Sequence, residues 1–294
     1  MDRLVDLVAA ELGQPVDPRA VALAAAIAAR YGEASRAVLF YGSCLRETRL
    51  DGLMLDFYLI VSDYHAAYGK TWLATANRLI PPNVFPFEAD GLAAKYAVLS
   101  EADFLRLCSR EADNVSVWAR FAQPSRLVWS SDDAAGRRAV EAVAQAAPTL
   151  LALAIPTVGA SSAAPLDLWK AGFTLTYNAE LRAERTGRSL SIVDVDPNRY
   201  ERIGEAALAE IAATTMSPDQ AMKHWRKLQR RGKWLSVVRL AKASLTFAGG
   251  IDYLAWKINR HAGTAIVIKP WQRRFPLIAA ITLVPRLLMK GAVR

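Results

Sequence analysis

The stretch FYGSCLRETRLDGLMLDFYLIV, residues 40–61, joins a Gly-Ser turn to an apolar strand that carries one aspartate. Because glycine has no side chain, the backbone N–H groups around Gly42 and Ser43 can approach a phosphate closely. Asp56, on the strand that follows, offers the hard oxygen ligands that suit Mg²⁺. This pairing favours a nucleotidyltransferase site, although Met54 stands where the first carboxylate of an Asp-x-Asp pair is usual. The plainer alternative is an ordinary turn beside a satisfied buried aspartate.

The segments around this stretch predict an α/β fold. Apolar, aromatic and β-branched runs indicate strands at residues 37–43, 53–61, 94–100 and 125–131. Helices are expected at residues 19–31 and 63–79, and a proline-rich loop at residues 79–91. Ser100, three residues before Asp103, has the spacing of a helix N-cap and predicts a further helix.

The second half of the chain is predicted to be mainly helical over residues 133–191. The run 142–166 has no charged residue until Asp167, but prolines and a glycine interrupt it, so we expect a buried helix pair and not a membrane span. Three parts are predicted: a nucleotidyltransferase domain (residues 1–140), a helical domain (141–250) and a basic amphipathic tail (251–294).

The composition disfavours several kinds of site. With 53% hydrophobic and 22% charged residues, the chain can bury a sizeable core. Its two cysteines, Cys44 and Cys108, cannot build a disulfide framework, and its three histidines lie far apart. These counts argue against a zinc site and favour a reducing compartment. The first residues, MDRLVDLVAAELGQ, have acids and no basic region before an apolar core, so we expect an amphipathic helix and not a signal peptide.

The positive charge is concentrated at the C-terminal end. Residues 221–294 hold 16 Lys and Arg against one acid, Asp252, whereas the preceding residues hold 21 basic and 27 acidic side chains. Such a segment predicts an anionic partner, either a membrane or a nucleic acid, although a solvated basic face is the plainer alternative. The apolar run Phe275–Val284 is too short to span a bilayer and is flanked by basic residues, which is typical of an interfacial segment. Trp225 and Trp234, lying among Lys and Arg, could instead stack on bases.

Five short motifs, taken in order, resemble those of the Tam41-type mitochondrial phosphatidate cytidylyltransferases and their bacterial relatives. They are YGS (residues 41–43), MLDF (54–57), KYAVLS (95–100), WARFAQP (118–124) and LTYNAELR (175–182). The single aspartate of MLDF is the pattern of that family, so Met54 is not damage peculiar to this chain. The departures from the pattern are Cys44, Ala97, Ala119 and Ala179 in place of glycine, and Glu180 in place of aspartate.

The resemblance implies an enzyme that joins CTP and phosphatidate to give CDP-diacylglycerol and pyrophosphate, with Mg²⁺. It implies a nucleotidyltransferase-fold mixed sheet with helices, then a mainly helical unit of winged-helix-like form. An amphipathic C-terminal segment would follow. The enzyme would lie peripherally on an anionic membrane surface, at the cytoplasmic face of a bacterial inner membrane or the matrix side of a mitochondrial one. No nucleic acid partner is expected.

The resemblance also assigns roles to individual residues. Catalytic roles fall to Asp56, Lys95, Arg120 and Arg182. Nucleotide binding falls to Tyr41, Gly42, Ser43, Tyr177 and Glu180. Asp56 would hold Mg²⁺, assisted by Asp51 or Glu180.

Each of these side chains has a plainer alternative that the sequence leaves open. Lys95 would be a solvated lysine at a strand end, and Tyr177 a core aromatic. Arg120 would pair with Glu111 or Asp113, Arg182 would form a surface pair, and Asp51 would be a turn residue.

Two rival functions remain open at this point. One is a nucleotidyltransferase that acts on another acceptor, such as RNA or a different phospholipid. The other is a lipid-binding or scaffold protein that keeps the fold but has no turnover.

Overall fold

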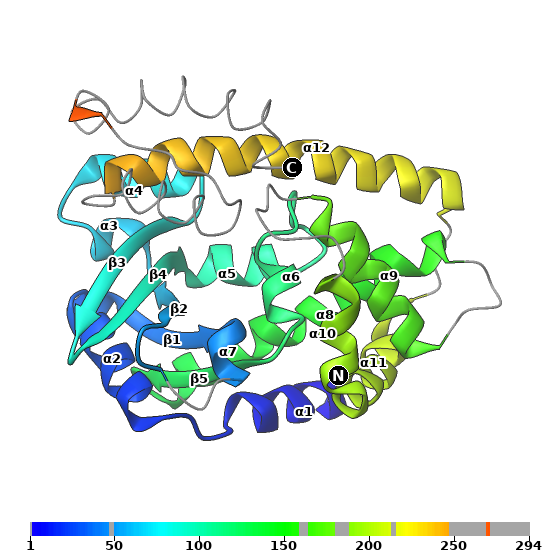
Figure 1. Ribbon diagram of the computed structural model, residues 1–294, viewed down its shortest axis with the longest axis horizontal. Helices are drawn as coiled ribbons and strands as arrows, with labels where there is room; N and C mark the ends of the chain where they lie inside the picture. The colour runs from blue at the N-terminus through cyan, green and yellow to red at the C-terminus, as the bar shows by residue number, and fades with distance from the viewer. Residues whose placement is uncertain are drawn as a thin grey trace.

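A computed structural model describes residues 2–46, 50–158, 164–179, 188–212, 216–246 and 269–270 of the 294-residue chain. Its centre is a five-stranded sheet with the strand order β3-β4-β2-β1-β5 (Figure 1). The strands are β1 (Ser35–Tyr41), β2 (Met54–Val61), β3 (Asn83–Ala89), β4 (Leu92–Ser100) and β5 (Ser125–Ser130). Strands β2 and β4 are parallel and all other neighbours are antiparallel. The sheet is therefore mixed, and the predicted α/β class is confirmed.

Helices cover both faces of the sheet. One face packs against α2 (Pro18–Ala29), α3 (Tyr64–Ala67) and α4 (Thr71–Leu79), and we call this packing the smaller cluster. The opposite face forms the larger cluster with α1 (Asp2–Leu12), α5 (Glu101–Cys108), α6 (Trp118–Phe121), α7 (Asp133–Ala144), α8 (Ala146–Ala154), α9 (Pro165–Tyr177), α10 (Arg188–Val195), α11 (Pro197–Glu210) and α12 (Pro218–Thr246). Short 3-10 turns are η1 (Gly32–Ala34), η2 (Ser43–Arg46) and η3 (Ile155–Thr157).

Strand β2 shows how the sequence divides between these clusters. Successive side chains of a strand point to opposite faces. Phe57 and Leu59 belong to the smaller cluster, whereas Tyr58 and Ile60 belong to the larger one. Asp56 has the parity of Tyr58 and Ile60, so the sheet places this carboxylate on the side of the larger cluster.

The second half of the chain contributes mainly helices to the larger cluster. Among the described residues, one helical stretch, Asp133–Thr157, is long and apolar enough to cross a membrane. Of its most apolar window, 67% is buried inside the protein. This stretch comprises α7, α8 and η3, and its packing supports the expected buried helix pair.

Two local predictions were wrong. Residues 79–91 do not form a loop, because β3 occupies Asn83–Ala89 and pairs with β4 through a turn at Asp90 and Gly91, both with positive φ. Strand β3 lies at the edge of the sheet, where a proline such as Pro86 is tolerated. The helix expected at 63–79 is divided into α3 and α4. By contrast, the N-cap at Ser100 is confirmed, since its hydroxyl accepts the Asp103 N–H at 3.2 Å.

No strand follows β5 within the described residues, so the described part of 141–250 is helical and has no strand for a wing. The larger cluster includes side chains from both sides of residue 140, such as Leu4 and Trp225. The domain limits at 140 and 250 stay predictions. The tail at 251–294 lies outside the described residues except for 269–270.

Candidate functional site

A row of polar side chains crosses the sheet at the point where β1 ends and β2 begins. Tyr41 on β1 pairs directly with Asp56 on β2, and Asp56 pairs directly with Lys95 on β4. Residues that face each other across neighbouring strands share one face of the sheet. The fold therefore brings Tyr41, Asp56 and Lys95 together on the side of the larger cluster.

The charges of this row neutralise each other. Lys95 Nζ lies 2.9 Å from Asp56 Oδ1, and the two side chains are only 25% and 21% exposed. Asp56 Oδ1 is buried and accepts no further hydrogen bond from the described residues. Within the described part of the chain, the ion pair with Lys95 therefore compensates for the burial of the Asp56 carboxylate. Lys95 is accordingly not a solvated lysine at a strand end.

The Gly-Ser turn lies against the other oxygen of the same carboxylate. Gly42 has φ +92°, and a Cβ at this position would lie 3.4 Å from Asp56 Oδ2. A side chain there would be strained by the backbone and would touch the carboxylate. Ser43 is exposed at the start of η2, and Cys44 is buried, with its thiol 3.5 Å from the Met54 carbonyl. Cys44, one of the departures from the family pattern, therefore fastens the turn to the beginning of β2.

An aromatic group connects this row to α6, the helix that carries Arg120. The Tyr41 ring lies 5.2 Å from that of Tyr58 and 5.9 Å from that of Phe121. Phe121 is the last residue of α6, directly after Arg120, whose guanidinium donates to the Ser116 carbonyl. The geometry places the short helix with Arg120 against the polar row.

The remaining predicted site residues are Tyr177, Asp51, Glu180 and Arg182. Tyr177 ends α9, is half-buried and packs against the larger cluster. Asp51 is 71% exposed and its carboxylate lies 2.9 Å from the Arg19 guanidinium. Glu180 and Arg182 lie outside the described residues. The metal role of Asp51 stays a prediction.

Of the predicted metal ligands, Asp56 lies at the glycine turn. Among them, no three His, Cys, Asp or Glu side chains form a group that could hold a metal. Mg²⁺ typically uses one or two carboxylates and completes its shell with water and substrate phosphates. Asp56, next to the glycine turn and its exposed Ser43, fits that donor set.

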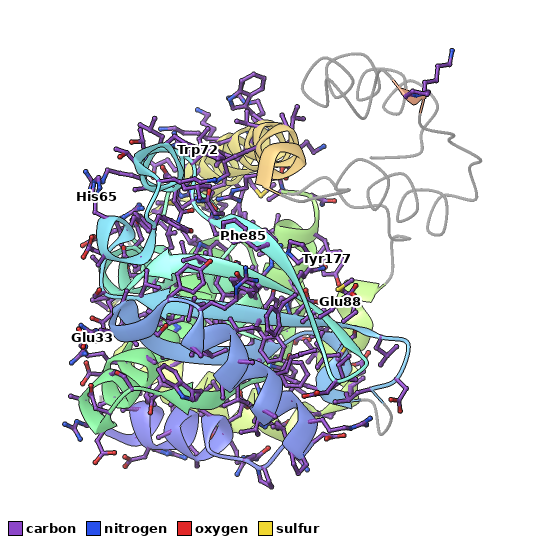
Figure 2. All side chains as sticks on the ribbon, turned by 90° about the vertical axis from the view of Figure 1, so that its left-hand side faces the viewer. Glu33, His65, Trp72, Phe85, Glu88 and Tyr177 are labelled. Atoms are coloured by element: carbon purple, nitrogen blue, oxygen red, sulfur yellow. The ribbon has the colours of Figure 1, made fainter. Side chains whose placement is uncertain are left out.

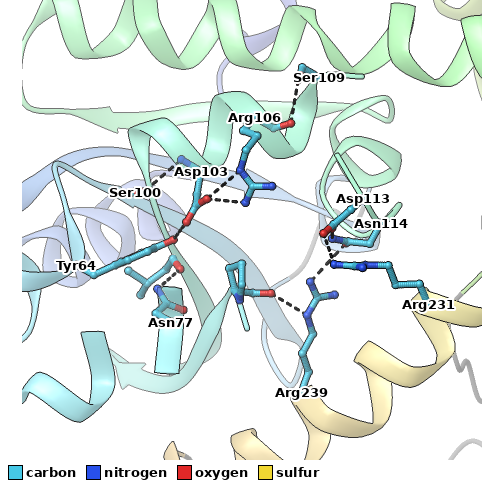
Figure 3. Close-up of polar contacts among 12 residues, drawn as sticks. Tyr64, Asn77, Ser100, Asp103, Arg106, Ser109, Asp113, Asn114, Arg231 and Arg239 are labelled. Atoms are coloured by element: carbon cyan, nitrogen blue, oxygen red, sulfur yellow. Dashed lines mark hydrogen bonds and ion pairs between the residues drawn. The ribbon is translucent and has the colours of Figure 1, made fainter. Parts of the chain in front are cut away.

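Three contacts were not predicted from the sequence. Lys95 was assigned to phosphates, but its pairing with Asp56 depends on the register of two strands that are far apart in sequence. The sequence signal for this pairing was a lysine in an otherwise apolar strand. Trp225, which we considered for base stacking, is fully buried, and its indole N–H donates to the Leu153 carbonyl at 2.9 Å. Asp113, a suggested partner of Arg120, pairs with Arg231 instead (Figure 3).

No protein-family model matches the chain, and no curated protein matches it. Among solved structures, a nucleotidyltransferase-like protein from Exiguobacterium sibiricum is similar over 92% of both chains, with 10% sequence identity and a TM-score of 0.29. A likeness this low carries no argument about the function of this chain.

Proposed function

We propose that the protein transfers a cytidylyl group from CTP to phosphatidate, forming CDP-diacylglycerol and pyrophosphate. The observation that carries this proposal is the position of Asp56. One of its oxygens pairs with Lys95, and the other lies against the positive-φ turn at Gly42. A carboxylate, an ammonium and a glycine turn within one small region are what a nucleoside triphosphate and its counter-ion require.

The chemistry needs positioning more than proton transfer. A phosphate oxygen of phosphatidate attacks the α-phosphorus of CTP, and the bond from that phosphorus to the bridging oxygen of the β-phosphate breaks. The electron pair leaves with pyrophosphate. Because the attacking oxygen is already anionic, no side chain has to remove a proton. Catalysis then consists of alignment and charge neutralisation.

The residues of the site divide this work. Gly42 and Ser43 provide a turn that a triphosphate can approach, and Lys95 and Arg120 provide positive charge. Asp56 would hold Mg²⁺, which when bound neutralises phosphate charge. Tyr177, Glu180, Arg182 and Asp51 keep the roles that the motif resemblance implies.

The choice of a lipid acceptor is supported by the motifs and by the charge of the chain. The five motifs occur in the family order, and the 16 Lys and Arg after residue 220 suit an anionic membrane. We place the protein peripherally on such a membrane. Its acceptor phosphate would thus lie at the surface where the enzyme is bound.

A panel of nucleotides and acceptors tests the proposal. Purified protein with Mg²⁺ and radiolabelled CTP, ATP, GTP or UTP is incubated with phosphatidate, phosphatidylglycerol or an RNA oligomer. We expect a labelled lipid from CTP and phosphatidate alone. Label in RNA or in another lipid would instead favour a nucleotidyltransferase with a different acceptor. A protein that binds vesicles but gives no product with any pair would be a lipid-binding protein without turnover.

A further inference from the structure

Helix α12 has a buried face and a basic face. Ala221, Trp225 and Leu228 are buried, and Gly232 approaches Ala179 so closely that a Cβ would lie 2.1 Å from its carbonyl oxygen. The outer face presents exposed side chains at helical spacing: Met222, Lys223, Arg226, Lys227, Arg230, Lys233 and Trp234. Within the described residues, these five cations form no ion pair, and their charge is available to a partner.

Helix α4 adds exposed apolar side chains to the same side of the molecule. Trp72 and Leu79 are 48% and 73% exposed, and their spacing of seven residues puts them on one face of the helix. Lys70 and Arg78, also exposed, flank them. Figures 1 and 2 both show α4 beside α12, and Figure 2 places Trp72 next to it.

Three contacts hold these two helices in a fixed relation. Arg239 on α12 donates through Nε to the Pro81 carbonyl at 2.8 Å (Figure 3). Lys242 donates to the Pro82 carbonyl at 2.8 Å and also to the carbonyl of Ile80, the residue that follows α4. These contacts join residues 80–82, directly after α4, to α12 and so hold the end of α4 beside that helix.

We propose that this surface rests on an anionic phospholipid bilayer, with Trp72, Leu79 and Trp234 in the headgroup region and the outer cations of α12 on lipid phosphates. Tryptophan and basic side chains together are typical of proteins that bind at a membrane interface. Leu79 gains nothing from a nucleic acid, whereas insertion into a bilayer removes it from water. The choice of lipid rests on the proposed function, whose acceptor is a membrane lipid.

Membrane contact would then be made by a folded part of the chain as well as by the basic tail, residues 251–294. Two classes of variant separate its apolar and charged contributions. The first is Trp72→Ser with Leu79→Ser, matched by Val195→Ser, an apolar side chain that is 62% exposed at the end of α10. The second is Lys227→Gln with Arg230→Gln, matched by Arg137→Gln on α7.

Full-length protein is sedimented with vesicles of phosphatidylcholine alone or mixed with phosphatidylglycerol, at several salt concentrations. We expect the α4 variant to bind mixed vesicles roughly tenfold more weakly with unchanged salt dependence. The α12 variant should bind about thirtyfold more weakly at low salt and show a smaller salt dependence. Both controls should bind as the unmodified protein does. Binding of the α4 variant equal to that of the unmodified protein would overturn the proposal. So would losses that appear with an RNA homopolymer and not with vesicles.

Activity measured in two forms of substrate distinguishes failure of this surface from failure of the proposed function. With phosphatidate dispersed in detergent, both variants should form CDP-diacylglycerol at the unmodified rate, and with vesicles they should be slower. If no variant or unmodified protein makes product while vesicle binding follows the expected pattern, the proposed reaction is wrong and the surface stands.

Discussion

Lys95 and Asp56 face each other across the parallel strands β4 and β2, with Lys95 Nζ 2.9 Å from Asp56 Oδ1. The pair is mostly buried at the edge of the larger cluster, beside the turn at Gly42. If Lys95 only stabilises the fold, its replacement should leave the reaction rate unchanged. If Lys95 also attracts the phosphates of the substrate, its replacement should slow the reaction. The two cases can be separated by experiment.

Lys95→Gln should reduce kcat/KM for CTP about a hundredfold, because it removes a positive charge next to the developing phosphate charge. Lys95→Arg should recover part of this loss, since it restores the charge with a different shape. Steady-state kinetics and Tm are measured for both, with Arg137→Gln on the surface of α7 as the control. A Lys95→Gln protein that loses stability and keeps its kcat/KM would make Lys95 purely structural.

Gly42→Ala should abolish CTP binding, because φ is +92° and the new Cβ would touch Asp56 Oδ2. Gly52→Ala is a matched control, since Gly52 has φ +75° and open space around its Cβ position. Both changes should lower the free energy of unfolding by about 1 kcal/mol through backbone strain. Calorimetric titration with CTP and Mg²⁺ is expected to show binding for the Gly52 variant only. Equal affinities would mean that the Gly42 turn does not approach the nucleotide.

Glu11→Gln should lower the free energy of unfolding by about 3–5 kcal/mol. The Arg199 side chain is 6% exposed and pairs with Glu11, and it also donates to the Ala122 carbonyl at 3.2 Å, where α6 ends. Burial alone would lower the pKa of Arg199, but Glu11 outweighs it and raises the pKa. Removing the carboxylate leaves a buried cation without its counter-charge.

Glu205→Gln is the control for that change, because the pair Arg3–Glu205 joins the same two helices, α1 and α11, at the surface. Its charged atoms are 3.8 Å apart and its side chains are 73% and 60% exposed. Exposed pairs contribute at most about 1 kcal/mol. The loss in free energy of unfolding, measured in urea, should therefore be severalfold larger for Glu11→Gln than for Glu205→Gln. Similar losses in the two variants would contradict the assigned role of Arg199.

Lys242 should make stability rise with pH above neutrality. Burial, followed by the charge of Arg239, lowers the pKa of Lys242 from its ordinary 10.5 to about 7. Between these values the unfolded chain binds a proton that the folded chain lacks, so raising the pH favours the folded state. The slope is at most about 1.4 kcal/mol per pH unit. The free energy of unfolding, measured in urea at pH 7–9, should rise with this slope in the unmodified protein. The slope should be smaller in Lys242→Met and unchanged in Lys233→Met. An equal slope in all three proteins would refute the role of Lys242.

The sequence was most informative where the pattern was local. Alternation in LMLDFYLIV predicted β2, and the Ser100 cap was recognised from its spacing. Strand β3 was missed because the prolines of residues 79–91 are typical of loops, and only its place at the sheet edge accommodates Pro86. The Asp56–Lys95 contact depends on long-range strand register, which no local pattern specifies.

Formation of CDP-diacylglycerol by unmodified protein and by Asp56→Asn tests the central claim most directly. Radiolabelled CTP, phosphatidate in detergent and Mg²⁺ are supplied to both, and their circular dichroism spectra and vesicle binding are compared. We expect labelled CDP-diacylglycerol from the unmodified protein, and none from an Asp56→Asn protein that is folded and still binds vesicles. Equal product formation by the two proteins would contradict the account.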